Sequence, residues 1–267
     1  MTTAASAHEI AVEIGGLPVL LRTADPAFLD VLRSRYAGFF ESASAPRFEF
    51  DIDLVEPRPS TGEDIQVHLQ NGSWRLSRGD FCAQWDPEQR KGQIRQSANP
   101  YSVDCVLRIL HSLMLAGEGG FLLHAASAIR DGKAFLFSGV SGAGKTTISR
   151  LAPSDVTLLT DEISYVRRDA HGYVAWGTPF AGELARLGEN CSAPLAALYF
   201  LNKGPENRMD PIPASDAVRL LLRNILFFAE DPDLVAHLFR SAFEFVERVP
   251  VRQLTFFPDA RVWDLIG

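Results

Sequence analysis

The feature that most constrains this chain is the glycine-rich segment Gly139–Thr146, which reads GVSGAGKT and fits the pattern GxxxxGK[ST] without departure. The apolar run Ala134–Phe137 precedes it, and the residues from Thr146 onward have the pattern of a helix. The pattern requires a strand, a loop and a helix in this order. Glycines let backbone N–H groups turn inward, where they and the helix N-terminus form a positive concave site. The segment therefore predicts binding of a nucleoside triphosphate.

Two side chains of this loop have expected roles of their own. Lys145 is expected to reach the β- and γ-phosphates, and the Thr146 hydroxyl is expected to coordinate a Mg²⁺ ion that bridges them. The remaining residues contribute mainly backbone. The predicted nucleotide-binding residues are Gly139, Ser141, Gly142, Ala143, Gly144, Lys145, Thr146 and Thr147.

Two carboxylates follow an apolar strand shortly after the loop. The segment Leu158–Glu162 reads LLTDE, so Asp161 and Glu162 end the strand. In a parallel sheet, the carboxyl ends of the strands open onto the same crevice as the phosphate loop. One carboxylate can hold the metal while the other takes a proton from an incoming hydroxyl or water. The predicted metal ligands are therefore Thr146, Asp161 and Glu162; a solvated strand end is the alternative.

A histidine lies on the strand before the one that leads into the loop. His124 interrupts the apolar run Phe121–Ala126, and a histidine there is often a hydrogen-bonded core residue. Imidazole and carboxylate could tune each other if this strand neighboured the one that carries Asp161. The sequence leaves both interpretations of His124 open.

The apolar pattern along the chain predicts an α/β fold with two domains. Residues 1–99 read as an N-terminal α+β domain that ends in an antiparallel meander with turns at Asn71-Gly72 and Asp86-Pro87. Residues 100–267 begin with an amphipathic helix and continue as a nucleotide-binding core. The meander aromatics Trp74, Phe81 and Trp85 either recognise a partner or belong to the core.

Composition limits the partners of the chain. Its 267 residues carry a net charge of −7, which argues against nucleic acid or an anionic membrane surface as the main partner. The N-terminus MTTAASAHE lacks the apolar core of a signal peptide, and charged or glycine residues interrupt the longest apolar stretches. We expect a cytoplasmic protein.

The chain resembles the kinase domain of HPr kinase/phosphorylase, whose fold is related to phosphoenolpyruvate carboxykinase. LLHAASAI (Leu122–Ile129), FLFSGVSGAGKTT (Phe135–Thr147) and LLTDE carry the resemblance, in that order and with the short spacing from loop to carboxylates. GTPFAGE (Gly177–Glu183) and the C-terminal VPVRQLTFFPDARVWDLI look like a divergent branch that accompanies peptide-modification gene clusters. The resemblance covers about residues 119–267.

The resemblance implies a P-loop kinase core and an ATP-dependent transfer to a serine or threonine hydroxyl of a peptide or protein, with Mg²⁺ as cofactor. It assigns proton removal from the acceptor to Asp161 and His124, with Lys145 at the transferred phosphate. Glu162 stands where the family usually has a second aspartate, and Thr147 where a carboxylate is frequent. The family also permits homo-oligomers.

Two other functions remain open from the sequence. The protein could be a nucleotide-gated binding module that closes around a partner with little phosphotransfer, or a kinase that acts on a small molecule. A carboxykinase is disfavoured, because the additional Lys and His metal ligands and the Arg-lined carboxylate site are not found.

Overall fold

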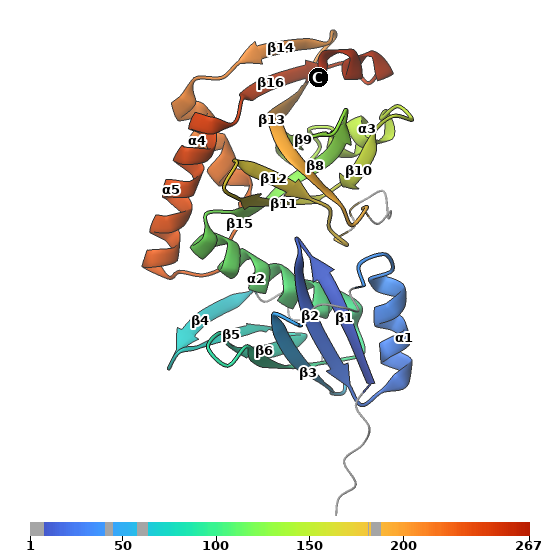
Figure 1. Cartoon of the computed structure of the whole chain (residues 1–267), viewed down its shortest axis with the longest axis vertical. Helices are drawn as coiled ribbons and strands as arrows, with labels where there is room; N and C mark the ends of the chain where they lie inside the picture. The colour runs from blue at the N-terminus through green and yellow to red at the C-terminus, as the bar shows by residue number, and fades with distance from the viewer. Residues whose placement is uncertain (1–7, 41–44, 58–63, 181, 183–187) are drawn as a thin grey trace, which may run out of the picture. The chain divides into compact units, whose positions relative to one another are not determined.

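The computed structural model of the protein describes residues 8–40, 45–57, 64–180, 182 and 188–267 (Figure 1). The chain divides into two compact units. The first unit contains Met1–His111 and Phe228–Pro232, and the second contains Ser112–Phe227 and Asp233–Gly267. The expected mobile N-terminal residues 1–7 lie outside the described part.

The first unit is built on a seven-stranded sheet in the order β1-β2-β3-β7-β6-β5-β4. Strands β2, β3 and β7 are parallel to one another, and the other neighbours are antiparallel. Helix α1 connects β2 to the parallel strand β3 and packs against β1 and β2. The elements are β1 (His8–Ile14), β2 (Leu17–Thr23), α1 (Pro26–Arg35), β3 (Phe48–Leu54), β4 (Gln66–Gln70), β5 (Ser73–Arg78), β6 (Phe81–Asp86) and β7 (Lys91–Gln96).

Local chemistry explains the boundaries that the sequence predicts here. The Asp25 side chain accepts hydrogen bonds from the amides of Ala27 and Phe28 and so caps α1. Asn71 and Gly72 both have positive φ, 51° and 77°, which suits the two-residue turn between β4 and β5. The antiparallel meander that the sequence predicts is confirmed.

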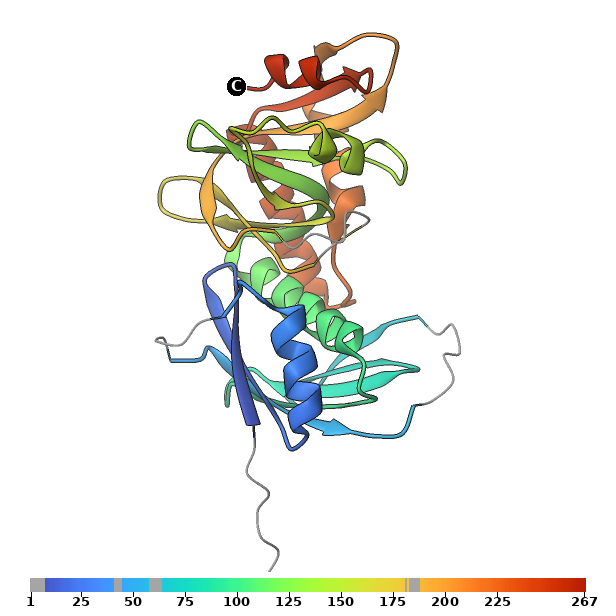
Figure 2. The ribbon, with the colours of Figure 1, turned by 90° about the vertical axis from the view of Figure 1, so that its right-hand side faces the viewer.

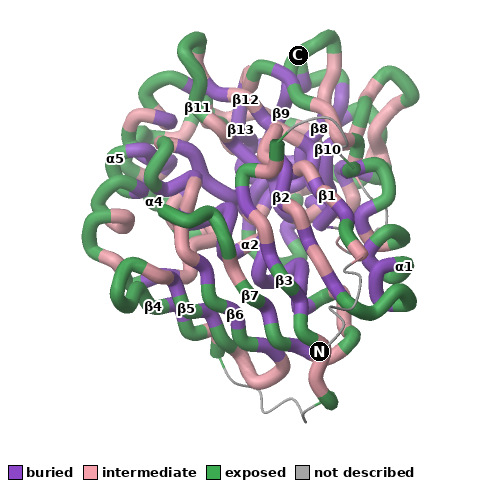
Figure 3. The backbone as a smooth tube through the Cα atoms, turned by 60° about the horizontal axis from the view of Figure 1, so that its bottom comes forward, coloured by how far each residue is buried: buried purple, intermediate pink, exposed green. Residues whose placement is uncertain are grey.

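The three meander aromatics belong to the core of the first unit. Trp74, Phe81 and Trp85 are all buried, and the Trp85 ring packs edge-on against Phe48 with 5.1 Å between centroids. Figure 3 shows the alternation of buried and exposed positions along these strands. Because their side chains face inward, they are not available as a recognition surface.

The second unit holds a nine-stranded mixed sheet with helices on both of its faces. Its helices are the end of α2 (Pro100–Glu118), α3 (Lys145–Arg150), α4 (Ala214–Asn224), α5 (Pro232–Arg248) and the 3₁₀ helix η1 (Ala260–Leu265). Its strands are β8 (Phe121–Arg130), β9 (Lys133–Ser138), β10 (Thr157–Thr160), β11 (Ile163–Arg168), β12 (Tyr173–Trp176), β13 (Ser192–Lys203), β14 (Arg208–Pro211), β15 (Ile225–Leu226) and β16 (Val251–Phe256).

Two long strands connect the halves of this sheet. The first part of β8 pairs with β11 and β15, and its second part pairs with β9 and β10. Strand β13 likewise pairs with β12 at its start and then lies between β9 and β16, parallel to both. The carboxyl ends of β9, β13 and β16 therefore meet at one edge of the sheet.

Both faces of the sheet are buried, which explains the continuous apolar runs in its strands. Along β9, Ala134 and Leu136 pack into the cluster that contains Phe245 of α5, whereas Phe135 and Phe137 face Ile148 of α3 and Trp263 of η1. Figures 1 and 2 show α4 and α5 away from α3 and η1 across the strands. The Trp263 Nε1 donates to the Ile148 carbonyl at 3.1 Å and so ties η1 to α3.

The structure differs from the sequence-based expectation in the direction of its strands. The sheet is mixed rather than parallel, because β8 runs antiparallel to all of its partners. Helix α4 ends at Asn224, where β15 begins, and the short strand β14 carries few apolar residues. Within the described residues, no helix is long and apolar enough to cross a membrane.

Candidate functional site

The loop Gly139–Thr146 joins β9 to α3, as its sequence predicts. Gly144 has a φ of 113°, and a Cβ there would lie 2.6 Å from the Phe256 ring, so only glycine fits. The Lys145 side chain is 8% exposed, and its Nζ donates to the carbonyl of Gly139 at 3.1 Å across the loop. Helix α3 has only six residues, so its dipole is small. The loop amides and the Lys145 ammonium therefore contribute most of the positive charge at this end of the helix.

Strand topology brings the two carboxylates to the same sheet edge as the loop. Strands β9 and β10 pair with opposite sides of β8, and both are antiparallel to it. They therefore run parallel to each other across β8, and their carboxyl ends point the same way. Asp161 and Glu162 follow β10 directly, as the loop follows β9. The expected juxtaposition of loop and carboxylates is present, although β8 separates their strands.

His124 lies on the strand that separates the loop from the carboxylates. Ile163, the first residue of β11, pairs with His124, and the carbonyl of His124 accepts from the Ser138 hydroxyl at 2.9 Å. Its neighbours Leu123 and Ala125 pack on the α5 side, so alternation places His124 on the α3 side. Burial, and secondarily the charge of Lys145, lower the pKa of His124 below its ordinary 6.5. The imidazole is therefore neutral near pH 7.

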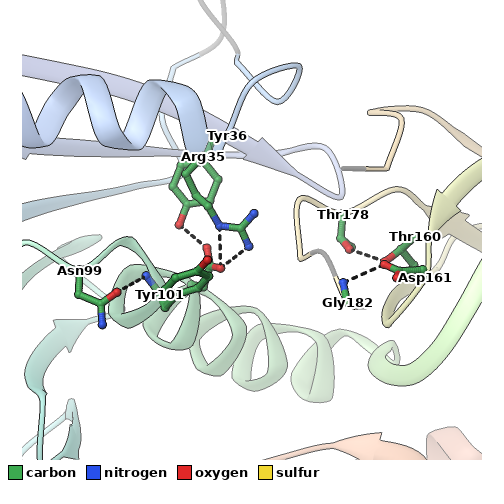
Figure 4. A network of polar contacts seen from close by, with 9 residues as sticks. Arg35, Tyr36, Asn99, Tyr101, Thr160, Asp161, Thr178 and Gly182 are labelled. Atoms are coloured by element: carbon green, nitrogen blue, oxygen red, sulfur yellow. Dashed lines mark hydrogen bonds and ion pairs between the residues drawn. The ribbon is translucent and has the colours of Figure 1, made fainter. Parts of the chain in front are cut away.

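Asp161 and Glu162 lie close together around one backbone position. The Asp161 carboxylate is 5% exposed and accepts from the Gly182 amide at 2.8 Å, as Figure 4 shows. A Cβ on Gly182 would lie 3.0 Å from Asp161 Oδ2 and 3.0 Å from Glu162 Oε2. These two oxygens are therefore no more than twice that distance apart, as required if both are to serve one cation directly or through water.

All of these groups line one cavity of about 710 Å³, a volume suited to a small-molecule ligand. Of the predicted residues, Gly139 and Ala143 do not line it: Gly139 starts the loop, and Ala143 packs into the core beneath it. The sequence did not single out two lining residues, Gly182 and Lys203. The lining residues are His124, Ser141, Gly142, Gly144, Lys145, Thr146, Thr147, Asp161, Glu162, Gly182 and Lys203.

The two additional residues had different signals in the sequence. Gly182 belongs to GTPFAGE, but nothing in that stretch indicates that its backbone contacts Asp161; Ala181 and Glu183 of the same stretch lie outside the described residues. Lys203 ends the apolar strand β13, and only the pairing of β13 with β9 places it beside the loop. In the described part of the chain, no three His, Cys, Asp or Glu side chains cluster as a metal site.

Replacing Gly182 with alanine is expected to separate the two carboxylates. Because the added Cβ would meet Glu162 Cβ at 2.9 Å and both carboxylate oxygens at 3.0 Å, the backbone or the side chains must move by a few tenths of an ångström. The sequence predicts Mg²⁺ at these carboxylates, and on that prediction the Mg²⁺ concentration for half-maximal activity is expected to rise by roughly tenfold. Gly117→Ala, near the end of α2, is the control, since no atom lies near its Cβ and its φ is not in the left-handed region. An unchanged Mg²⁺ requirement would contradict this role.

The fold and the cavity define a mixed α/β protein that gathers a glycine loop, a lysine, a neutral histidine and two carboxylates at one sheet edge. Residues 103–266 match the family described as SynChlorMet cassette protein ScmC, and the chain belongs to this family. Membership in a cassette-protein family is consistent with the peptide-modification gene cluster that the sequence resemblance implies.

Other comparisons add only a distant similarity. Among solved structures, the chain is similar to the Hpr(Ser) kinase/phosphatase from Coxiella burnetii, with 15% sequence identity and a TM-score of 0.25. That alignment covers 47% of this chain and 92% of the other. No curated protein matches the chain significantly.

Proposed function

We propose that the protein is a Mg-ATP-dependent kinase that transfers the γ-phosphoryl group to a serine or threonine hydroxyl of a peptide or protein. The observation that carries the proposal is the single cavity in which Lys145, His124, Asp161 and Glu162 surround the open side of the loop. These are the groups that phosphoryl transfer requires, because its catalysis consists mainly of positioning and charge stabilisation. We also propose that the second unit has a P-loop kinase core of the HPr kinase type.

The side chains in the cavity fit a magnesium ion. Asp161 and Glu162 offer carboxylate oxygens around Gly182, and the Thr146 hydroxyl lines the same cavity. Mg²⁺ prefers such oxygen donors and takes its remaining ligands from water and substrate phosphates. Bound there, the ion would neutralise charge on the β- and γ-phosphates.

The proposed step uses Asp161 as the base. Its carboxylate accepts the proton of the acceptor hydroxyl as that oxygen forms a bond to the γ-phosphorus, and the bond from the γ-phosphorus to the bridging oxygen breaks to release ADP. Lys145 stabilises the charge that develops on the phosphoryl oxygens. Neutral His124 adds no positive charge beside the carboxylate that accepts the proton.

A polypeptide acceptor is favoured over a metabolite by membership in a cassette family and by the peptide-modification setting that the resemblance implies. The test is to incubate the purified protein with γ-labelled ATP, Mg²⁺ and fractionated lysate of its source organism, and to locate the label by mass spectrometry. Label on a specific serine or threonine supports the proposal. Label on a metabolite indicates a small-molecule kinase, and ATP binding without transfer indicates a gated binding module.

The acid limb of the activity profile is expected to have its midpoint below pH 6.5. The reason is that burial and Lys145 hold the pKa of His124 below 6.5, so that the imidazole takes a proton only in more acidic solution. A protonated His124 would compete with the acceptor proton for Asp161. The measurement is the pH profile of kcat/KM for the labelled acceptor.

Two variants assign the acid limb of this profile. His124→Asn removes the titrating group, so we expect a lower rate with the limb attributable to histidine absent. His171→Asn changes an exposed histidine in the turn between β11 and β12 and is expected to leave the profile unchanged. A midpoint above 6.5, or the same limb in His124→Asn, would show that His124 does not titrate as argued.

A further inference from the structure

A second lysine reaches the cavity from a strand that the proposed chemistry does not use. Lys203 is the last residue of β13, where it pairs with Phe256 of β16. The next residue is fixed as well: the Gly204 amide donates to the Phe256 carbonyl at 3.1 Å, and a Cβ on Gly204 would lie 2.4 Å from Thr255. The backbone at Lys203 is therefore held in place on both sides.

The side chain of Lys203 is exposed, in contrast to that of Lys145. Across the described residues, its ammonium forms no ion pair or hydrogen bond, although it lines the same cavity as the loop. A solvated ammonium on a fixed backbone and a flexible stem can follow an anion with little reorganisation of the protein. Lys203 thus has the properties of a ligand-binding cation rather than of a structural one.

The order of strands places Lys203 at the end of the cavity opposite the carboxylates. Along this sheet edge, β10 leads to Asp161, β8 carries His124, β9 leads to the loop and β13 ends at Lys203. Adjacent strands lie about 4.8 Å apart, so β10 and β13 are separated by roughly 14 Å. A phosphoryl group that reacts within hydrogen-bond reach of Asp161 lies toward the β10 end.

We infer that Lys203 binds the phosphates of the nucleotide that are not transferred and thereby sets the direction in which the triphosphate lies along the loop. This inference rests on the proposed nucleotide-dependent function. The two carboxylates repel phosphate oxygens unless a metal intervenes, whereas Lys203 attracts them at the other end. The chain of phosphates therefore enters with its terminal group toward Asp161 and its α and β groups toward Lys203.

This assignment separates Lys203 from Lys145 in kinetic terms. The α-phosphate and the side of the β-phosphate away from the breaking bond change little between ATP, the transition state and ADP, so a contact to them contributes nearly uniform binding. Removing such a contact raises KM and leaves kcat nearly unchanged. For an exposed cation, we expect a loss of about five- to tenfold in affinity.

The experiment measures the dissociation constants of MgATP and MgADP by calorimetry, and the transfer rate at saturating ATP, for wild type, Lys203→Gln and Lys203→Arg. Lys133→Gln is the matched control, because Lys133 is an exposed lysine at the far end of β9. We expect Lys203→Gln to weaken both nucleotides by the same factor with a rate within about twofold of wild type, and Lys203→Arg to restore affinity.

Three results would overturn the assignment in different ways. If wild type binds both nucleotides, and Lys203→Gln binds them equally well and transfers at the wild-type rate, Lys203 has no phosphate role. If affinity is unchanged but the saturated rate falls, Lys203 contacts the transferred group instead. If wild type binds neither nucleotide, the proposed kinase function fails, and the Lys203 assignment fails with it.

Discussion

Replacing Lys145 with alanine is expected to lower phosphoryl transfer by on the order of 10³-fold and to abolish stabilisation of the protein by MgATP. The Lys145 ammonium is almost fully buried beneath the loop, where its charge acts in a poorly solvated environment. Water that fills the vacated space cannot supply a fixed positive charge at the β- and γ-phosphates. The measurements are the transfer rate and the shift of the thermal unfolding midpoint on addition of MgATP.

Controls separate this effect from a loss of folding. Loss of the hydrogen bond from Lys145 Nζ to the Gly139 carbonyl is expected to cost the ligand-free variant on the order of 1 kcal/mol of unfolding free energy. Lys133→Ala removes the same charge at the other end of β9 and is expected to keep both activity and the MgATP-induced shift. Full transfer activity in Lys145→Ala would remove the loop from the proposed mechanism.

Replacing Asp161 with asparagine is expected to reduce the saturated transfer rate by about 10²- to 10⁴-fold, because the amide cannot accept the acceptor proton. The side chain keeps its shape, and its Oδ1 can still accept from the Gly182 amide, so the fold of the site is expected to remain. Single-turnover transfer of label, measured together with the MgATP dissociation constant, distinguishes lost chemistry from lost binding.

Two further variants test whether the effect is specific to Asp161. Glu162→Gln is expected to raise the Mg²⁺ requirement more than it lowers the saturated rate, since we assign that carboxylate to the metal rather than to proton transfer. Asp131→Asn is the neutral control, because position 131 has a φ of 49°, which asparagine adopts readily. If Asp161→Asn transfers at the wild-type rate, Asp161 is not the base.

The first unit contains a buried ionic network that the sequence does not reveal. Arg35 of α1 forms an ion pair with Asp104 of α2, which also accepts from the Tyr36 hydroxyl at 2.8 Å. Figure 4 shows these contacts together with the Asn99 side chain, which accepts from the Tyr101 amide at 3.1 Å. The partners are far apart in sequence, and no local pattern pairs them.

The sequence by itself determined the features that depend on neighbouring residues. The Gly139–Thr146 loop follows from glycines that permit φ values closed to other residues, and the cap at Asp25 follows from a side chain that reaches the next amides. Most strands and helices follow from the period of their apolar residues. Local patterns also identified three candidate site residues. Lys145 lies in the glycine loop, Asp161 follows an apolar strand, and His124 interrupts an apolar run.

Only the tertiary structure decided which strands lie side by side. When both faces of a strand are buried, its apolar pattern does not predict which strands pair with it. The sequence therefore could not show that β8 lies antiparallel between β9 and β10. That pairing places His124 between the loop and Asp161, and the parallel pairing of β13 with β9 brings Lys203 to the same cavity. The hydrogen bond from the Gly182 amide to Asp161 likewise depends on long-range packing. Glycine has no side chain, so nothing in the sequence indicates this contact.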